Sequence, residues 1–143
     1  MEKTIQIYQE ILDAIDIGSP IKVISFLDYK TMKPKKLAGC YVIKFKDRDL
    51  YAGLGQIFIR QGHHHRKGIN EMRLGTRDTK GWKWGRDNTD FCNQIDEWKL
   101  IYAEVPKEKQ KDVEDCLKTR LEPLFNDEST WARIKFMKPG DSI

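Results

Sequence analysis

The chain has 143 residues, of which 39% are hydrophobic and 34% charged, and this size and composition fit one compact domain with a modest core. Its net charge of +4 and pI of about 8.9 favour polyanionic partners without identifying one. Three widely spaced cysteines, Cys40, Cys92 and Cys116, are typical neither of a disulfide framework nor of a zinc site. The N-terminus lacks the apolar core of a signal peptide, and no apolar run approaches the roughly 20 residues of a membrane span. We therefore expect a soluble, cytoplasmic protein with no membrane segment.

The first predicted element is a helix over residues 4–17, where apolar side chains recur at helical spacing before a glycine and a proline end the pattern. Residues 21–29 read either as a strand or as a short apolar link, and the pattern leaves both open. A basic, proline-containing connector follows over residues 30–36.

The strongest local signal is a hairpin whose strands run over 37–46 and 50–54, with Asp47–Asp49 as the turn. Tyr41 and Tyr51 stand ten positions apart. Because side chains alternate along a strand, the two phenols share a face only if the loop has an odd length or a bulge restores the parity. The predicted three-residue loop meets this demand. Ordinary strand tyrosines with no chemical role are the alternative.

The second half of the chain adds a helix within 56–73, a long exposed loop over 75–90, a third strand over 97–106 and a clear amphipathic helix over 107–126. A short apolar-basic alternation in the tail fits an edge strand. Together the segments predict an α+β fold with a small antiparallel three-stranded central sheet flanked by helices.

Arg60 and His64 are spaced i, i+4, so on a helix they point the same way. The guanidinium suits bidentate binding of a phosphate, and the imidazole titrates near neutrality and can transfer protons. A solvated basic helix face is the simpler reading. The run of three histidines does not predict a metal site, because consecutive helical side chains diverge by about 100°.

Glu114 lies beside the apolar stripe of the last helix and has two interpretations. It is either a surface carboxylate paired with Lys118 one turn on, or a carboxylate aimed into a cleft, where oxygen ligands suit Mg²⁺.

These parts occur in a fixed order along the chain: Gly39-Cys40-Tyr41, Tyr51-Ala52-Gly53, Arg60, His64, Glu114, Pro123 and Asn126. This order resembles the GIY-YIG nuclease superfamily over residues 37–126. The last three positions also resemble the family in spacing, since Glu114 precedes Pro123 by nine residues and Asn126 by twelve.

Three departures from the family pattern are visible. Cys40 and Ala52 replace the usual isoleucines between glycine and tyrosine. The intervals from Tyr41 to Tyr51 and from Tyr51 to Arg60 are each one residue shorter than is common. The 75–90 loop resembles an insertion.

The resemblance implies a GIY-YIG-like nuclease domain over 37–126, preceded by an N-terminal helix and extension (1–36) and followed by a tail (127–143). It implies a DNA endonuclease that hydrolyses phosphodiesters with one Mg²⁺ or Mn²⁺ ion. The implied catalytic residues are Tyr41, Tyr51, Arg60, His64 and Glu114. Tyr41 would be the general base, Arg60 would stabilise the transition state and Glu114 would hold the metal. The implied structural residues are Gly39, Gly53 and Asn126.

Basic and aromatic side chains crowd the segment after Arg60 and are expected to bind DNA: Arg66, Lys67, Arg73, Arg77, Lys80, Trp82, Lys83, Trp84 and Arg86. Lysine and arginine contact phosphates, while a tryptophan stacks on bases or, equally, pins the loop with a small core. Cutting both strands with one site per chain would call for a homodimer or two successive events. The competing class is a non-catalytic nucleic-acid-binding module that retains the fold.

Overall fold

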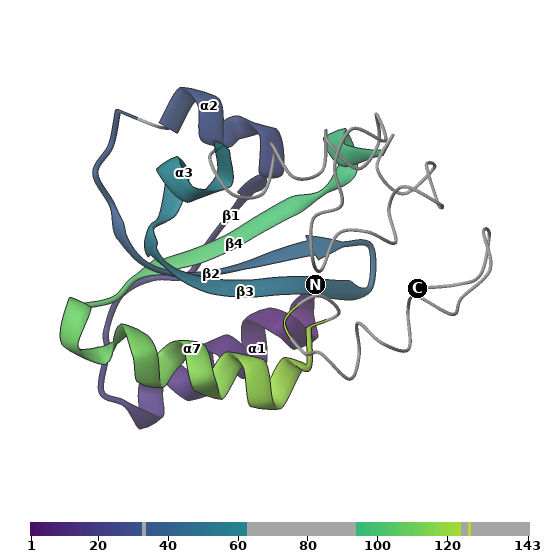
Figure 1. The fold of residues 1–143 in the computed structure, drawn as a ribbon. Coiled ribbons are helices and arrows are strands. Elements are labelled where there is room, and N and C mark those ends of the chain that lie inside the picture. Colours follow the sequence, from purple (N-terminus) through teal and green to yellow (C-terminus); the bar gives the residue numbers. More distant parts are fainter. Residues whose placement is uncertain (33, 63–93, 124–125, 127–143) are drawn as a thin grey trace.

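A computed structural model of the chain describes residues 1–32, 34–62, 94–123 and 126. The elements in chain order are α1 (Glu2–Ala14), β1 (Lys22–Ser25), the 3₁₀ turn η1 (Phe26–Asp28), α2 (Tyr29–Met32), β2 (Ala38–Phe45), β3 (Arg48–Gln56), α3 (Ile57–Arg60), the 3₁₀ turn η3 (Ile95–Glu97), β4 (Lys99–Glu104) and α7 (Lys107–Leu121). The fold is α+β, as the sequence predicts (Figure 1).

The central sheet is antiparallel, and within the described part of the chain it has four strands in the order β1-β4-β2-β3. The three-stranded prediction is therefore one strand short. The additional strand is β1, which pairs with β4 from Lys22↔Tyr102 to Ser25↔Lys99. It lies within residues 21–29, which the sequence pattern fits either as a strand or as a short apolar link. β1 has only four residues and no clean polar-apolar alternation, so its pairing depends on a partner more than 70 positions away.

The β2–β3 hairpin turns more tightly than expected. Phe45 pairs with Arg48, so Lys46 and Asp47 alone form the loop, and the predicted three-residue turn Asp47–Asp49 is wrong. Lys46 takes a left-handed conformation with φ of 52°. The register shifts between Ile43 and Lys44, which marks a β-bulge. The bulge restores the parity that a two-residue loop would otherwise break, and this was the other route that alternation allowed.

Helices cover both faces of the sheet: α1 and α7 pack below it, and α2 and α3 lie above it (Figure 1). Alternation along β2 divides its side chains between the two layers. Cys40 and Val42 join the lower core with Leu12 of α1 and Leu117 of α7. Tyr41 joins the upper core. The upper core is rich in aromatic rings, among them Phe26, Tyr29, Phe58, Trp98 and Tyr102. Helix α1 thus shares one core with the hairpin.

The helix boundaries follow local signals. α1 spans Glu2–Ala14, inside the predicted range except at its start. α7 ends at Leu121, five residues before the predicted end, and Glu122 adopts a left-handed conformation with φ of 48°. Pro123 explains this ending, because a residue before proline is disfavoured in the helical region. The helix predicted within 56–73 begins at Ile57, and its continuation beyond residue 62 lies outside the described residues.

Two of the three thiols belong to the described residues, and both are free. Cys40 is buried and Cys116 is half-buried. Among the helices that the structure describes, none is long and apolar enough to cross a membrane.

Candidate active site

Tyr41 and Tyr51 lie on the same face of the hairpin. Tyr41 pairs with Gly53, and Tyr51 pairs with Ile43 two residues along β2, so all four residues project to one side. The two rings stack with centroids 6.3 Å apart and an angle of 27° between their planes. Tyr41 is fully buried and Tyr51 is half-buried. The proximity that the resemblance implies for the two phenols is therefore present.

Two glycines in β3 make room for the chemistry-bearing side chains. A Cβ at Gly53 would lie 2.5 Å from the Tyr41 hydroxyl oxygen and 3.0 Å from Cε1 of Tyr51. A Cβ at Gly55 would lie 2.8 Å from Cδ of Arg60, and Gly55 has a φ of +122°, which other residues rarely adopt. Tyr41 and Arg60 thus lie against bare backbone. Sequence reasoning missed Gly55, although two glycines spaced i, i+2 face the same side of a strand and signal such a close approach.

Arg60 is the last residue of the short helix α3, directly after β3. Its guanidinium hydrogen-bonds to Tyr41. Burial lowers the pKa of Arg60, but the hydrogen bond and the charges of Tyr41, Tyr51 and Glu114 outweigh burial and raise it. The side chain is a permanent cation held against a phenol, in a geometry suited to binding an anionic group beside the Tyr41 oxygen.

Burial dominates the ionisation of Tyr41 and raises the pKa of its phenol well above the usual range. Hydrogen bonds from Arg60 and Gln61 act in the opposite direction, and so does the Arg60 charge, while Tyr51 adds to the increase. In the absence of further cations the phenol therefore stays protonated at neutral pH. A role as general base requires additional positive charge next to the oxygen.

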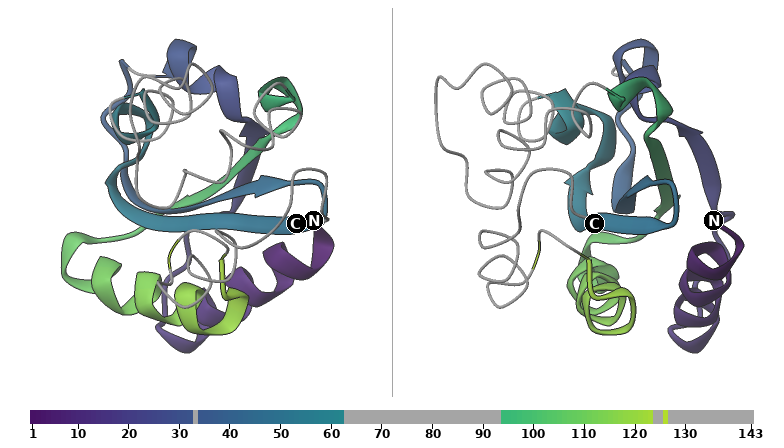
Figure 2. Two further views of the ribbon diagram at one scale, coloured as in Figure 1. Left: turned by 45° about the vertical axis from the view of Figure 1, so that its right-hand side comes forward. Right: turned by 90° about the vertical axis from the view of Figure 1, so that its right-hand side faces the viewer.

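Glu114 lies on α7, in the layer below the sheet. Figure 2 (right) shows α7 beneath the β3 side of the sheet and α3 above that same side. Burial is the main cause of the raised pKa of Cys40, and the Glu114 charge adds to it. The same charge also helps to raise the pKa of Arg60, after the larger contributions of Tyr41 and Tyr51. Its side chain is only 11% exposed. The Glu114 charge on one side of the sheet thus contributes to the electrostatics of Arg60 on the other.

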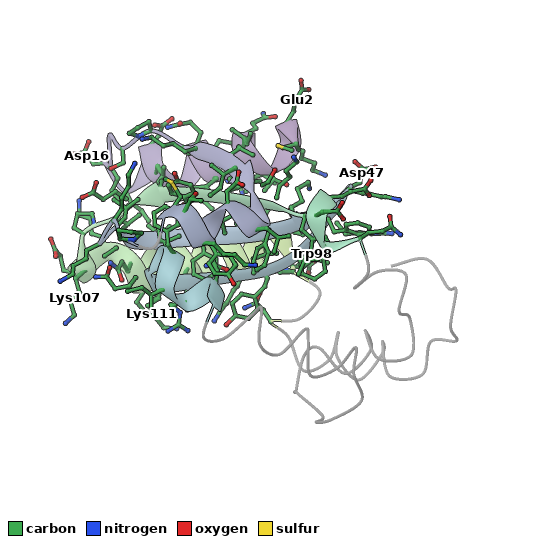
Figure 3. All side chains as sticks on the ribbon, turned by 90° about the horizontal axis from the view of Figure 1, so that it is seen from above. Glu2, Asp16, Asp47, Trp98, Lys107 and Lys111 are labelled. Carbon is green, nitrogen blue, oxygen red and sulfur yellow. The ribbon has the colours of Figure 1, made fainter. Side chains whose placement is uncertain are left out.

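Two lysines pair with the Glu114 carboxylate. Lys118 Nζ lies 3.1 Å and Lys111 Nζ 3.3 Å from the same oxygen, Oε1. The pairing with Lys118 that the i, i+4 spacing predicts is present. Figure 3 shows Lys111 at the margin of the molecule where α3 lies. The carboxylate is nevertheless mostly buried and its charge acts on Arg60, which fits the cleft interpretation.

A divalent ion would find one carboxylate here. Within the described residues, no three His, Cys, Asp or Glu side chains gather as a metal cage. Mg²⁺ nevertheless keeps several waters and is commonly held by one or two carboxylates together with substrate phosphates. A single, largely buried carboxylate such as Glu114 fits that mode of binding and does not fit an all-protein cage.

Two of the implied structural residues, Gly39 and Asn126, make close contacts with neighbouring strands. The Asn126 side chain accepts a hydrogen bond from Ala52 N at 2.7 Å and donates one to Ala52 O at 2.8 Å. It therefore pairs with the outer edge of β3 as a neighbouring strand would. A Cβ at Gly39 would collide with the Ala103 carbonyl of β4, so only glycine fits this close strand approach.

Several predicted site residues lie outside the described residues. They are His64 and the nine predicted DNA-binding residues: Arg66, Lys67, Arg73, Arg77, Lys80, Trp82, Lys83, Trp84 and Arg86. A separate apolar groove of about 340 Å³ lies between α1 and α7 and is lined in part by Ile11, Ile15 and Cys116. None of the predicted catalytic residues lines this groove.

Comparisons with models of protein families, with curated proteins and with solved structures found no match to this chain. The functional proposal therefore depends on the geometry of the residues themselves and on the motif order along the sequence.

Proposed function

We propose that this protein is a metal-dependent DNA endonuclease of the GIY-YIG type. The observation that carries the proposal is the meeting of Tyr41, Tyr51 and Arg60 on bare glycine backbone, with the Glu114 charge close enough to act on Arg60. Tyr41, Tyr51 and Arg60 come from the consecutive elements β2, β3 and α3, whereas Glu114 comes from α7, much later in the chain. A guanidinium, a phenol and a carboxylate can supply the anion-binding group, the proton acceptor and the metal ligand of phosphodiester hydrolysis.

Arg60 would bind the scissile phosphate and stabilise the negative charge that grows on it in the transition state. The guanidinium is suited to this role because it interacts with Tyr41 and because its side chain packs against the bare backbone of Gly55. A preorganised donor of this kind typically contributes a factor of about 10²–10³ to the rate.

Tyr41 would accept the proton of the attacking water. Burial raises the pKa of its phenol and opposes this role, whereas hydrogen bonding with Arg60 and Gln61 lowers the pKa and favours the phenolate. The stacked ring of Tyr51 limits the orientation of Tyr41. His64, which lies outside the described residues, is proposed to assist this proton transfer, since its ordinary pKa is near neutrality.

Glu114 would hold Mg²⁺ or Mn²⁺. The ion, when bound, neutralises charge on the scissile phosphate and on the leaving oxygen. Lys111 and Lys118 occupy one carboxylate oxygen and would have to yield to the ion or share the carboxylate with it. Once released, their ammonium groups are free to contact the DNA backbone.

DNA is the proposed partner because the chain is basic and the segment after Arg60 concentrates lysine, arginine and tryptophan. The same proposal includes a cytoplasmic location, where DNA is accessible. It also includes a homodimer as one way to cut both strands.

A second candidate is a non-cleaving nucleic-acid-binding module. The observation in its favour is that the two reactive groups are restrained: burial raises the pKa of Tyr41, and Glu114 is paired with two lysines. Such a module would need Arg60 only for phosphate binding.

A nicking assay on supercoiled plasmid with Mg²⁺ or Mn²⁺ separates the two candidates. We expect the wild-type chain to nick the plasmid and Glu114→Ala and Tyr41→Phe to lose this activity. Matched controls are Tyr8→Phe, another buried tyrosine whose hydroxyl bonds to Cys40 O, and Glu108→Ala on an exposed part of α7. Binding without nicking under every metal would support the module. If Glu114→Ala and Tyr41→Phe nick as fast as wild type, the site assignment is wrong.

A further inference from the structure

The basic connector over residues 30–36 has no part in the site described above. It carries four lysines and no carboxylate. Three of these lysines belong to the described residues and are exposed: Lys30, Lys35 and Lys36, here called the connector lysines. None of them forms an ion pair with another described residue. Asp28, also exposed, is the one carboxylate between β1 and β2, so the local charge is strongly positive.

The backbone that carries the connector lysines is held in place. Lys35 N donates to Met32 O at 2.9 Å, and Leu37 N donates to Lys35 O at 3.1 Å. Tyr29 belongs to the upper core, and Met32 and Leu37 pack against it. The connector lysines therefore lie on the outside of a segment whose inner side shares a core with Tyr41. An ordered backbone lowers the entropy that binding a partner costs.

The same segment joins directly to α3. Ile57 N, at the start of α3, donates to Leu37 O at 2.9 Å. Helix α2 contacts α3, and Figure 1 shows the two helices next to each other above the sheet. Arg60 ends α3, about 5 Å of helical rise beyond Ile57. The connector thus meets one end of a short helix whose other end carries the proposed phosphate-binding guanidinium.

We propose that the connector lysines bind DNA phosphates that flank the phosphate at Arg60. The inference rests on the proposed function, in which Arg60 binds the scissile phosphate. Phosphates along one strand follow each other at about 3.4 Å of helical rise, so a strand that passes Arg60 brings further phosphates to the other end of α3. Lysine contacts of this kind position the DNA without reading its sequence. The segment before residue 37 thereby becomes part of the substrate surface.

The test measures binding of the full chain to a fluorescein-labelled DNA duplex by anisotropy, without divalent metal, from about 50 to 200 mM NaCl. The connector variant removes all three lysine charges: Lys30→Gln, Lys35→Gln and Lys36→Gln. The matched control changes three other exposed lysines, on α1, on β1 and in the hairpin loop: Lys3→Gln, Lys22→Gln and Lys46→Gln. Because both variants lose the same charge, a difference between them reports on position.

We expect the connector variant to lower the slope of log affinity against log salt by about 2–3, close to one for each lost phosphate contact. Its affinity should fall roughly tenfold or more at about 100 mM NaCl, equally for two duplexes of different sequence. In plasmid nicking, KM should rise and kcat should stay unchanged, because the connector lysines lie outside the reacting groups. The control should keep the wild-type slope, KM and kcat.

A connector variant that binds with the slope and affinity of the control overturns the inference, whether or not the chain is a nuclease. A loss confined to one duplex sequence also overturns it, because phosphate contacts do not depend on sequence. A wild-type chain that binds DNA through these lysines but nicks no plasmid defeats the proposed nuclease alone. The contact surface then stands and belongs to the non-cleaving module.

Discussion

The two faces of the sheet each bury a tyrosine, and the surroundings of these tyrosines differ. Below the sheet, Tyr8 donates to the Cys40 carbonyl at 2.7 Å, and desolvation raises its pKa. Among the described residues, a backbone hydrogen bond with Ala103 opposes this shift, and no cation does. Above the sheet, Tyr41 is equally inaccessible and burial likewise raises its pKa, but hydrogen bonding with Arg60 and the Arg60 charge lower it. The comparison teaches that burial alone keeps a phenol protonated in a structural role. Burial beside a cation instead gives a phenol that is suited to proton transfer.

The largest expected effect comes from removing the space that the upper face provides. Gly53→Ala would place a Cβ 2.5 Å from the Tyr41 hydroxyl and displace the ring. We expect nicking to fall by at least about 100-fold, because a displacement of this size at a reacting group has that consequence. We also expect the free energy of unfolding to fall by about 1–3 kcal/mol from overpacking. Plasmid nicking and urea denaturation measure the two effects.

Gly18→Ala is the control for this prediction, since a Cβ at Gly18 meets no atom within 4 Å. It should change neither property. Full activity in Gly53→Ala would mean that Tyr41 does not need its observed place on the glycine backbone.

The pH dependence of nicking is expected to be steep. Since burial raises the pKa of Tyr41, the phenolate fraction and the rate should rise about tenfold for each pH unit through the neutral range. Tyr8→Phe should keep this slope. A rate that is flat from about pH 6 to 9 would exclude a phenol of raised pKa as the base.

The same phenols predict a loss of stability in alkali on both faces. In the unfolded chain a phenol titrates near pH 10, whereas Tyr8 and Tyr41 titrate higher in the folded chain. Above about pH 10 the unfolded state therefore releases these protons first, and the stabilisation that is present below that pH is lost as the pH rises. Urea denaturation at increasing pH should show this decline, and Tyr8→Phe and Tyr41→Phe should each reduce it.

Asn126 offers a smaller effect at the outer edge of β3. Asn126→Ala removes two hydrogen bonds to Ala52 and exposes an unpaired strand edge, so we expect a loss of about 1–3 kcal/mol in the free energy of unfolding. Gln9→Ala removes an exposed side-chain hydrogen bond to Asp13 and should lower the free energy of unfolding only slightly. Equal stability of the two variants in urea would show that the edge does not depend on Asn126.

The features that sequence reasoning predicted correctly are local. The hairpin, the shared face of Tyr41 and Tyr51, and the pairing of Glu114 with Lys118 follow from alternation or from helical spacing. The loop length was wrong because a bulge and an odd loop give the same parity, and the sequence does not choose between them.

The features that it missed are non-local. Among the described strands, β1 pairs with β4 alone, which follows more than 70 residues later, so local residue types do not decide between a strand and a link. Gly55 gains its role from the Arg60 side chain that lies against it. A pattern of residue types along the chain does not contain those contacts.

The smallest expected effect concerns metal affinity at Glu114, whose carboxylate is paired with two lysines and whose charge acts on Arg60. Lys118→Met removes an ammonium 3.1 Å from Oε1 and so removes a competitor of the metal. Partly exposed ion pairs contribute up to about 1 kcal/mol, so Mn²⁺ affinity measured by titration calorimetry should rise about two- to fivefold. Lys107→Met, at an exposed position on the same helix, should leave the affinity unchanged. If Lys118→Met binds Mn²⁺ no more tightly than Lys107→Met, the metal does not compete for this carboxylate oxygen. Glu114 would then serve Arg60 through its charge alone, and the lower layer would contribute electrostatics to the site without contributing a ligand.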